Sequence, residues 1–480
     1  MNNIKDYLNK LKMPQNSAIT VIYLLLLISV ISKSLFLSLI LTLLLVVTLV
    51  VYRNSVLGFY LGVFSLSFDQ FFVPTTFSLK LHMLVFLATF LALVYGGIQS
   101  RKTPKLPPKI LTVPLLLLFI FSVASYFFAV DKTLTIRFLG ALIYGFAVFA
   151  LTYIFADNKE RVVKTALALG GGLIVSSAVA IYQFAAFYFG VDFYRKINIL
   201  NPGNFARPKG IFDHPNFLAN FFLVSLPIFV SQVLGEKTKS RVKTSLISIG
   251  LAVLIVTFSR AAYGAFIVSL AIIFYFMFRE TQFSTVAKKL ISMMLGTSIV
   301  VGFLLFIIGP LQPDFVPIGG ARDRSQEKLL AERISSSIDP EAVTNLERLQ
   351  IWTAGVYMLE DHWLTGIGLE NFKIRYKDYK LPEAERTEVV AHNSYFQLLI
   401  ETGVFGFLSF VWFWLALATG ALKKIFGSKD IVTKSLLVGA LAALVGVSLQ
   451  NLTNSVFYYA HTWFLYGFVA ALARPDTIKK

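Results

Sequence analysis

Long apolar runs recur along the whole of this 480-residue chain, and they constrain its fold more than any other feature. Several runs reach the ~20 residues that a helix needs to cross a bilayer. They do not alternate between apolar and polar positions, as the strands of a membrane barrel would. Apolar residues make up 56% of the chain and its mean hydropathy is +0.71, which is too apolar for a soluble protein. The sequence therefore predicts an all-α, polytopic membrane protein.

The apolar runs predict about 12–14 transmembrane helices. A short interfacial helix is expected before them, in residues 1–16, because apolar residues fall on one helical face there and lysines fall off it. The predicted spans are 17–32, 34–52, 55–70, 80–98, 111–130, 134–156, 163–189, 216–234, 244–259, 261–278, 290–309, 394–419, 435–450 and 456–473.

The charge distribution predicts which segments face the cytoplasm. If residues 1–16 are inside and the spans alternate, the inner segments hold 25 Lys/Arg and 7 Asp/Glu, which is the positive-inside pattern. Helices 1–11 then occupy 17–309, an extracytoplasmic helical loop occupies 310–393, helices 12–14 occupy 394–473, and residues 474–480 form a cytoplasmic tail. The net charge of +18 points first to this topology and to anionic headgroups, and only weakly to nucleic acid.

The long loop between 310 and 393 carries the regular pattern of a folded segment. Apolar residues recur every three or four positions between 343 and 359, which predicts an amphipathic helix, and Gly366-Ile367-Gly368 ends it. His392 follows at the junction between this loop and the next apolar span. A neutral imidazole accepts a proton near neutral pH, so His392 is a candidate general base. The alternative is that His392 lies at the end of an interfacial helix and has no catalytic role.

Three predicted outer segments carry cations that topology does not require: Arg207 with Lys209 and His214, then Arg260, then Arg348. Arg260 stands between two apolar runs, where an arginine usually faces a cavity or a ligand; the alternative is a tight turn whose arginine reaches lipid phosphates. His214 suits a helix start, and Arg348 could pair with a loop acid. Several guanidinium groups on one face suit an anionic, phosphate-bearing ligand. We find no metal-ligand cluster, Walker loop, dinucleotide fingerprint or serine-hydrolase elbow.

In order along the chain, four groups of residues resemble the bacterial O-antigen ligase and polymerase superfamily of membrane glycosyltransferases. They are Arg207 with Gly210…His214-Pro215-Asn216, then Ser259-Arg260-Ala261, then Arg348…Trp352…Gly366-Ile367-Gly368…Phe372, and finally His392-Asn393…Glu401-Thr402-Gly403. The resemblance covers about residues 200–415.

The resemblance implies a GT-C-like membrane fold and an undecaprenyl-diphosphate-linked glycan donor, used without a metal or other cofactor on the outer face of the bacterial inner membrane. By the family pattern His392 is the catalytic base, and Arg207 and Arg260 bind the donor diphosphate. Lys209, His214, Arg348 and Asn393 are candidate substrate-binding residues. The physics agrees, because fixed guanidinium groups stabilise a departing diphosphate and imidazole accepts the acceptor's proton. One base without a carboxylate nucleophile predicts inversion at the anomeric carbon.

The acceptor remains open at this stage between two classes. A ligase transfers the glycan to a sugar of lipid A-core, whereas a glycan polymerase transfers it to a second lipid-linked glycan. A transporter of lipid-linked glycans is a third alternative, in which the cations only bind headgroups. The ordered loop argues against a transporter, because transporters keep their sites near the middle of the membrane.

Overall fold

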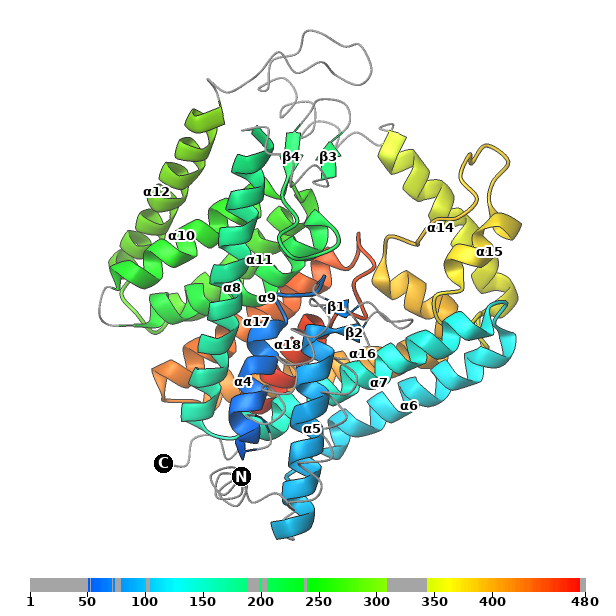
Figure 1. Ribbon diagram of the computed structural model, residues 1–480, viewed down its shortest axis with the longest axis horizontal. Coiled ribbons are helices and arrows are strands. Elements are labelled where there is room, and N and C mark those ends of the chain that lie inside the picture. Colours follow the sequence, from blue (N-terminus) through cyan, green and yellow to red (C-terminus); the bar gives the residue numbers. More distant parts are fainter. Residues whose placement is uncertain are drawn as a thin grey trace, which may run out of the picture. The chain divides into compact units, whose positions relative to one another are not determined.

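The structure, a computed structural model, describes residues 51–474 except 52, 71, 74–78, 101–103, 189–197, 201–204, 237–239 and 309–342. The predicted interfacial helix, the span at 17–32, nearly all of the span at 34–52, the first part of the long loop and the tail beyond 474 lie outside the described residues. What is described is almost entirely helical, as predicted (Figure 1). The chain divides into two compact units, residues 1–105 and 106–480, and each is treated by itself.

The first unit contains a helical pair. Helix α4 (Ser55–Ser65) packs against α5 (Leu81–Ser100), and the two are joined through a two-residue antiparallel ribbon, β1 (Phe72–Val73) and β2 (Leu79–Lys80). At the ribbon the buried Asp69 carboxylate accepts a 2.6 Å hydrogen bond from Lys80 Nζ, and it lies 3.5 Å from His82 Nε2. This ion cluster fixes the turn from which α5 begins.

The second unit consists of helices joined mostly by short turns. Polar caps define several helix starts; for example, Asp131 Oδ1 accepts from Leu134 N at 2.8 Å. The helices are α6 (Lys109–Ser125), the 3-10 turn η1 (Tyr126–Phe128), α7 (Lys132–Phe155), α8 (Lys159–Tyr188), α9 (Pro215–Gly235), α10 (Arg241–Val256), α11 (Arg260–Phe278), α12 (Phe283–Ile308), α14 (Val343–His362), α15 (Phe372–Tyr379), α16 (Ser394–Gly427), α17 (Ile431–Gln450) and α18 (Ala460–Leu472).

Nine helices in the described part of the chain are long and apolar enough to cross a membrane: α5 to α9, α11, α12, α16 and α17. Helices α4 and α18 are shorter apolar helices, and α10 has 16 residues. Together they cover the twelve predicted spans from residue 55 onwards. The two remaining predicted spans fall in or next to the undescribed first fifty residues.

The all-α fold class is as predicted, and two small antiparallel ribbons accompany the helices. The second pairs β3 (Asn198–Leu200) with β4 (Phe205–Arg207), and it places Asn198 opposite Arg207. Strands of two or three residues are too short to produce the alternating pattern by which a strand is recognised in a sequence. The ribbon matters because Arg207 is its last residue.

Helices α9 and α17 form the centre of the second unit. In the most apolar 18-residue stretch of each helix, 83% of the residues of α9 and 72% of those of α17 are buried. They run antiparallel, and an added Cβ at Gly439 of α17 would lie 2.6 Å from the Ile228 Cα of α9. This glycine lets the two backbones approach closely. Because the helices are antiparallel, the start of α9 and the end of α17 meet at the same end of the bundle, where Gln450 Nε2 donates to the Asn216 carbonyl oxygen. The candidate site lies at that end.

The loop helices are joined to α16 at a break in that helix. Gly403 has φ +72° and Gly366 has φ +68°, which a residue with a side chain rarely adopts. The two glycines also approach closely, since an added Cβ at Gly366 would lie 2.3 Å from the Glu401 carbonyl oxygen. Hydrogen bonds from Ile367 N to Ile400 O and from Gly368 N to Glu401 O close the junction. Two of the sequence groups that carry the family resemblance are thus in direct contact.

Candidate functional site

Arg207 is held at the end of β4, with only 8% of its surface exposed. Its Nε donates to the Thr257 carbonyl oxygen at 2.8 Å, and its Nη2 donates to Asn216 Oδ1 at 2.8 Å. Thr257 belongs to the turn between α10 and α11, and Asn216 belongs to the first turn of α9. The arginine therefore joins three segments that are far apart in the sequence, and its guanidinium plane has a fixed orientation.

Arg260 is the first residue of α11, immediately after a tight turn in which Phe258 has φ +51°. The backbone thus has the tight turn that was the alternative interpretation of this segment. The Arg207–Thr257 hydrogen bond ties this turn to β4, so both predicted diphosphate-binding arginines belong to one local structure.

Lys209 lies just past Arg207, and a glutamine from α8 shapes its backbone. Gln183 Oε1 accepts from Lys209 N at 3.1 Å and from Gly210 N at 2.8 Å, while its Nε2 donates to the Gly210 carbonyl oxygen at 2.7 Å. Gly210 has φ +57°, which suits the sharp turn after the lysine. Gln183 was not singled out in the sequence; its only signal there is an amide among the mostly apolar residues near the end of α8.

His214 caps α9, as its place before Pro215 predicts. Its Nδ1 accepts the Asn216 backbone N–H at 3.1 Å. Burial, followed by the positive charge of Arg207, lowers the pKa of His214 to about 4. The ring is therefore neutral at neutral pH, but one of its two nitrogens is already used for capping.

His392 stands just before α16 with φ +50°, a left-handed backbone conformation that is uncommon outside glycine. Contacts on both sides hold it there. Trp352 Nε1 of α14 donates to the Ala391 carbonyl oxygen at 3.0 Å, and Asn393 Oδ1 accepts from the backbone N–H groups of Tyr395 and Phe396 at 3.1 Å each. Asn393 thus acts as a helix cap in this structure.

The pKa of His392 is lowered from its ordinary value of 6.5. The main cause is burial and the next is the positive charge of Arg348, with Glu347 acting in the opposite sense. A lowered pKa keeps the imidazole neutral at pH 7, which is the form that accepts a proton.

Positive charges surround both histidines. The charge of Arg348 acts on His392, and burial, followed by the positive charge of Arg260, lowers the pKa of Arg348 itself. Arg207 and Lys209 act on His214, and a charge on His392 would lower the pKa of His214 as well. Glu347 forms its ion pair with Arg386, at 3.2 Å. Cations of the three predicted outer segments are therefore neighbours in series: Arg348 lies between His392 and Arg260, and His214 lies between His392 and Arg207. Such a group of cations would stabilise an anionic ligand.

This arrangement coincides with a family match. Residues 245–411 match the family described as O-antigen ligase. The segment belongs to the O-antigen ligase and polymerase superfamily. No curated protein matches the chain. This match over residues 245–411, together with the many apolar helices of the described chain, supports a multi-pass bacterial membrane protein of the O-antigen ligase/polymerase type. The match includes Arg260, Arg348 and His392, whereas Arg207 lies before its first residue.

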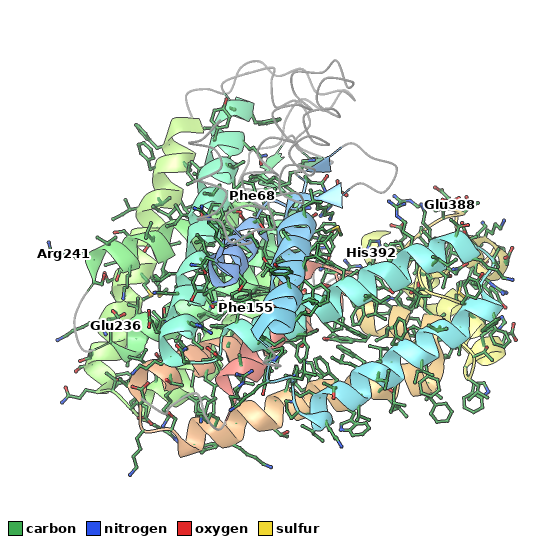
Figure 2. The ribbon with its side chains drawn as sticks, turned by 60° about the horizontal axis from the view of Figure 1, so that its bottom comes forward. Phe68, Phe155, Glu236, Arg241, Glu388 and His392 are labelled. Carbon is green, nitrogen blue, oxygen red and sulfur yellow. The ribbon has the colours of Figure 1, made fainter. Side chains whose placement is uncertain are left out.

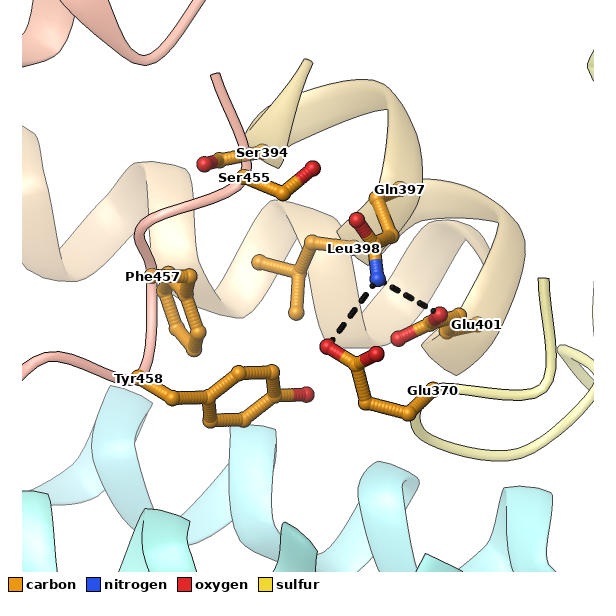
Figure 3. Close-up of a pocket in the computed structure, with 8 residues that line it drawn as sticks. All are labelled: Glu370, Ser394, Gln397, Leu398, Glu401, Ser455, Phe457 and Tyr458. Atoms are coloured by element: carbon orange, nitrogen blue, oxygen red, sulfur yellow. Dashed lines mark hydrogen bonds between the residues drawn. The ribbon is translucent and has the colours of Figure 1, made fainter. Parts of the chain in front are cut away.

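Beside this candidate site lies a small cavity with two carboxyl groups (Figure 3). Gln397 Nε2 donates to Glu370 Oε1 at 3.2 Å and to Glu401 Oε1 at 2.9 Å. Burial raises the pKa of Glu370 to about 7. The amide bridge adds a side-chain link between the loop after α14 and the first turns of α16. The cavity is lined by Glu370, Ser394, Gln397, Leu398, Glu401, Ser455, Phe457 and Tyr458.

In the part of the chain that the structure describes, no three His, Asp or Glu side chains are grouped closely enough to hold a metal ion. The charged groups that act on the candidate base are Arg348, Glu347 and Arg386. Residues 450–455, the last residue of α17 and the turn that follows it, also reach the site and were not singled out in the sequence. Their Asn and Ser residues are ordinary turn residues by composition.

Proposed function

We propose that this protein is a glycan ligase that moves a glycan from an undecaprenyl-diphosphate-linked donor to an acceptor hydroxyl of the lipid A-core type. The observation that carries the proposal is the placement of Arg207 beside the turn that begins at Thr257 and leads into Arg260. Arg348 lies near both Arg260 and His392, and the pKa of His392 is lowered so that its imidazole is neutral. The membership of residues 245–411 in the superfamily supports this reading.

The chemistry divides between the cations and the base. Arg207 and Arg260 bind the diphosphate and stabilise the charge that grows on it as the anomeric bond breaks. Neutral His392 takes the proton of the acceptor hydroxyl as that oxygen attacks the anomeric carbon. Direct displacement inverts the configuration at that carbon. Lys209, His214, Arg348 and Asn393 are proposed to line or shape the substrate site, with His214 and Asn393 capping helices.

We place the site on the extracytoplasmic face of the bacterial inner membrane. Figure 2 supports this placement: His392 and Glu388 lie on the opposite side of the second unit from Glu236 and Arg241. The segment between α9 and α10 is rich in lysine and arginine, as cytoplasmic segments are.

The chain contains no cysteine, so topology is testable with single introduced thiols. Thr387 is exposed before His392, and Lys429 is exposed between α16 and α17. An impermeant thiol reagent applied to intact spheroplasts should label Thr387→Cys and should reach Lys429→Cys only after the membrane is opened. The reverse pattern would place His392 in the cytoplasm, where this donor chemistry does not fit.

The acceptor is tested by a transfer assay with the purified protein and a labelled lipid-diphosphate-linked glycan. Lipid A-core and a second lipid-linked glycan are offered separately. We expect the label on lipid A-core. Label on longer lipid-linked glycans would instead assign a polymerase, which uses the same donor chemistry.

A further inference from the structure

The turn of residues 450–455, here called the Asn454 turn, meets both halves of the proposed site. On the arginine side, Asn454 Oδ1 accepts from Asn216 Nδ2 at 2.8 Å. The same Asn216 side chain accepts from Arg207 Nη2 through its Oδ1, also at 2.8 Å. A single side chain therefore separates Asn454 from the guanidinium group of Arg207.

On the histidine side, the Asn454 carbonyl oxygen accepts from Ser394 Oγ at 2.7 Å and from Ser394 N at 3.1 Å. Val456 N donates to the same Ser394 Oγ at 3.0 Å. Ser394 is the first residue of α16 and lies two positions after His392. Because Ser394 is only 2% exposed, these bonds are shielded from water and hold the start of α16 firmly.

Buried amides anchor the turn from within the bundle. Gln450 Nε2 donates to the Asn216 carbonyl oxygen at 3.1 Å, and Gln450 Oε1 accepts from Asn220 Nδ2 at 2.7 Å. His461 Nε2 lies 2.9 Å from Asn220 Oδ1. Gln450, Asn220 and His461 are each at most 1% exposed. The Asn454 turn is therefore fixed to α9, α17 and α18 at once.

We propose that Asn454 is a positioning residue, which sets the distance between the guanidinium of Arg207 and the imidazole of His392. The inference rests on the proposed function, since it takes Arg207 as the diphosphate holder and His392 as the base. The Asn454 carboxamide holds Arg207 through Asn216, and the Asn454 backbone carbonyl holds Ser394, two residues after His392. A misplacement of about 1 Å between reacting groups can lower a rate ~10²-fold.

The test compares Asn454→Ala with wild type by single-turnover transfer at saturating donor and by binding of undecaprenyl diphosphate. Alanine removes the acceptor for Asn216 and keeps the backbone carbonyl. We expect the rate to fall ~10–100-fold, with the dissociation constant changed by less than ~5-fold. Leu452→Ala, an exposed position in the same turn, should match wild type in both measurements.

Asn454→Asp keeps an oxygen acceptor for Asn216 but loses the Nδ2 that donates to the Gln450 carbonyl oxygen at 3.3 Å and to Thr453 Oγ1 at 3.1 Å. Its rate should therefore lie between the rates of wild type and Asn454→Ala. The double variant Asn216→Ala/Asn454→Ala should transfer at nearly the rate of the slower single variant. Both changes break the same hydrogen bond, from Asn216 Nδ2 to Asn454 Oδ1. If Asn454→Ala does not fold, Asn454→Ser replaces it, since serine is a turn residue without a carboxamide acceptor.

Two results would overturn the inference: a wild-type rate in Asn454→Ala, or an equal fall in Asn454→Asp and Asn454→Ala. Either result counts against Asn454 alone if His392→Ala and Arg207→Ala lose transfer as proposed. If His392→Ala keeps its rate, the proposed function itself fails.

Discussion

His392→Ala should lose transfer while it keeps the donor. Removal of a general base typically lowers a rate ~10²–10⁴-fold. No charge partner of the diphosphate is removed, so undecaprenyl diphosphate should bind about as well as it does to wild type. The measurement is the single-turnover rate with labelled donor, together with an equilibrium binding titration on the same preparation.

The matched control is His362→Ala. His362 ends α14, is partly exposed, and lies outside the group of charges around His392. It should transfer at the wild-type rate. The base assignment is wrong if His392→Ala turns over near the wild-type rate, or if it loses donor affinity as far as the arginine variants do. His214 would then be the next candidate.

The pH profile gives a second test of His392. Because burial and the Arg348 charge lower its pKa, the imidazole stays neutral until the pH falls below its ordinary value of 6.5. The acid limb of kcat/KM, which reports the free enzyme, should therefore have its midpoint below 6.5. Arg348→Gln removes one lowering charge and should move that midpoint upward. The assignment would be contradicted if substitution of neither His392 nor Arg348 changed the midpoint of the acid limb.

Arg260→Ala should weaken binding of the donor diphosphate, whereas His392 should still accept the proton of the acceptor hydroxyl. Hydrogen bonds to charged groups contribute about 1.5–3 kcal/mol, so kcat/KM should fall ~10–150-fold. Arg207→Ala should fall by a similar factor, although it also leaves the Thr257 carbonyl and Asn216 without a donor.

Lysine should rescue Arg260 poorly, because an ammonium group lacks the planar fork that matches phosphate oxygens. Arg241→Ala is the matched control: Arg241 is exposed, begins α10, and lies on the side of the unit opposite His392 (Figure 2). Wild-type kinetics in a well-folded Arg260→Ala protein would remove Arg260 from the donor site.

The helices and the order of the charged groups could be predicted from the sequence, because both depend on local patterns. Apolar runs long enough to cross a bilayer mark α5 to α9 and α16, and the three-to-four residue period marks α14. His214 was expected at a helix start because proline follows it, and it caps α9.

The contacts that assemble the site could not be predicted, because they join residues far apart in the chain. Gly366 and Gly403 approach each other through their backbones. A glycine in a loop or at a helix break does not indicate in the sequence which residue it will contact. Gln183, Asn216 and Asn454 act through side-chain amides, which are common in turns and in buried helix faces. The short ribbon that ends at Arg207 has too few residues for a pattern.

The most direct test of the account is bond formation by the purified wild-type protein, with labelled lipid-diphosphate-linked glycan, lipid A-core and a metal chelator present. The account predicts one lipid diphosphate released for each glycan transferred, with inverted configuration at the new glycosidic bond. Retained configuration would contradict direct displacement. Movement of intact donor across a proteoliposome bilayer with no glycosidic product would contradict the transferase and assign a transporter.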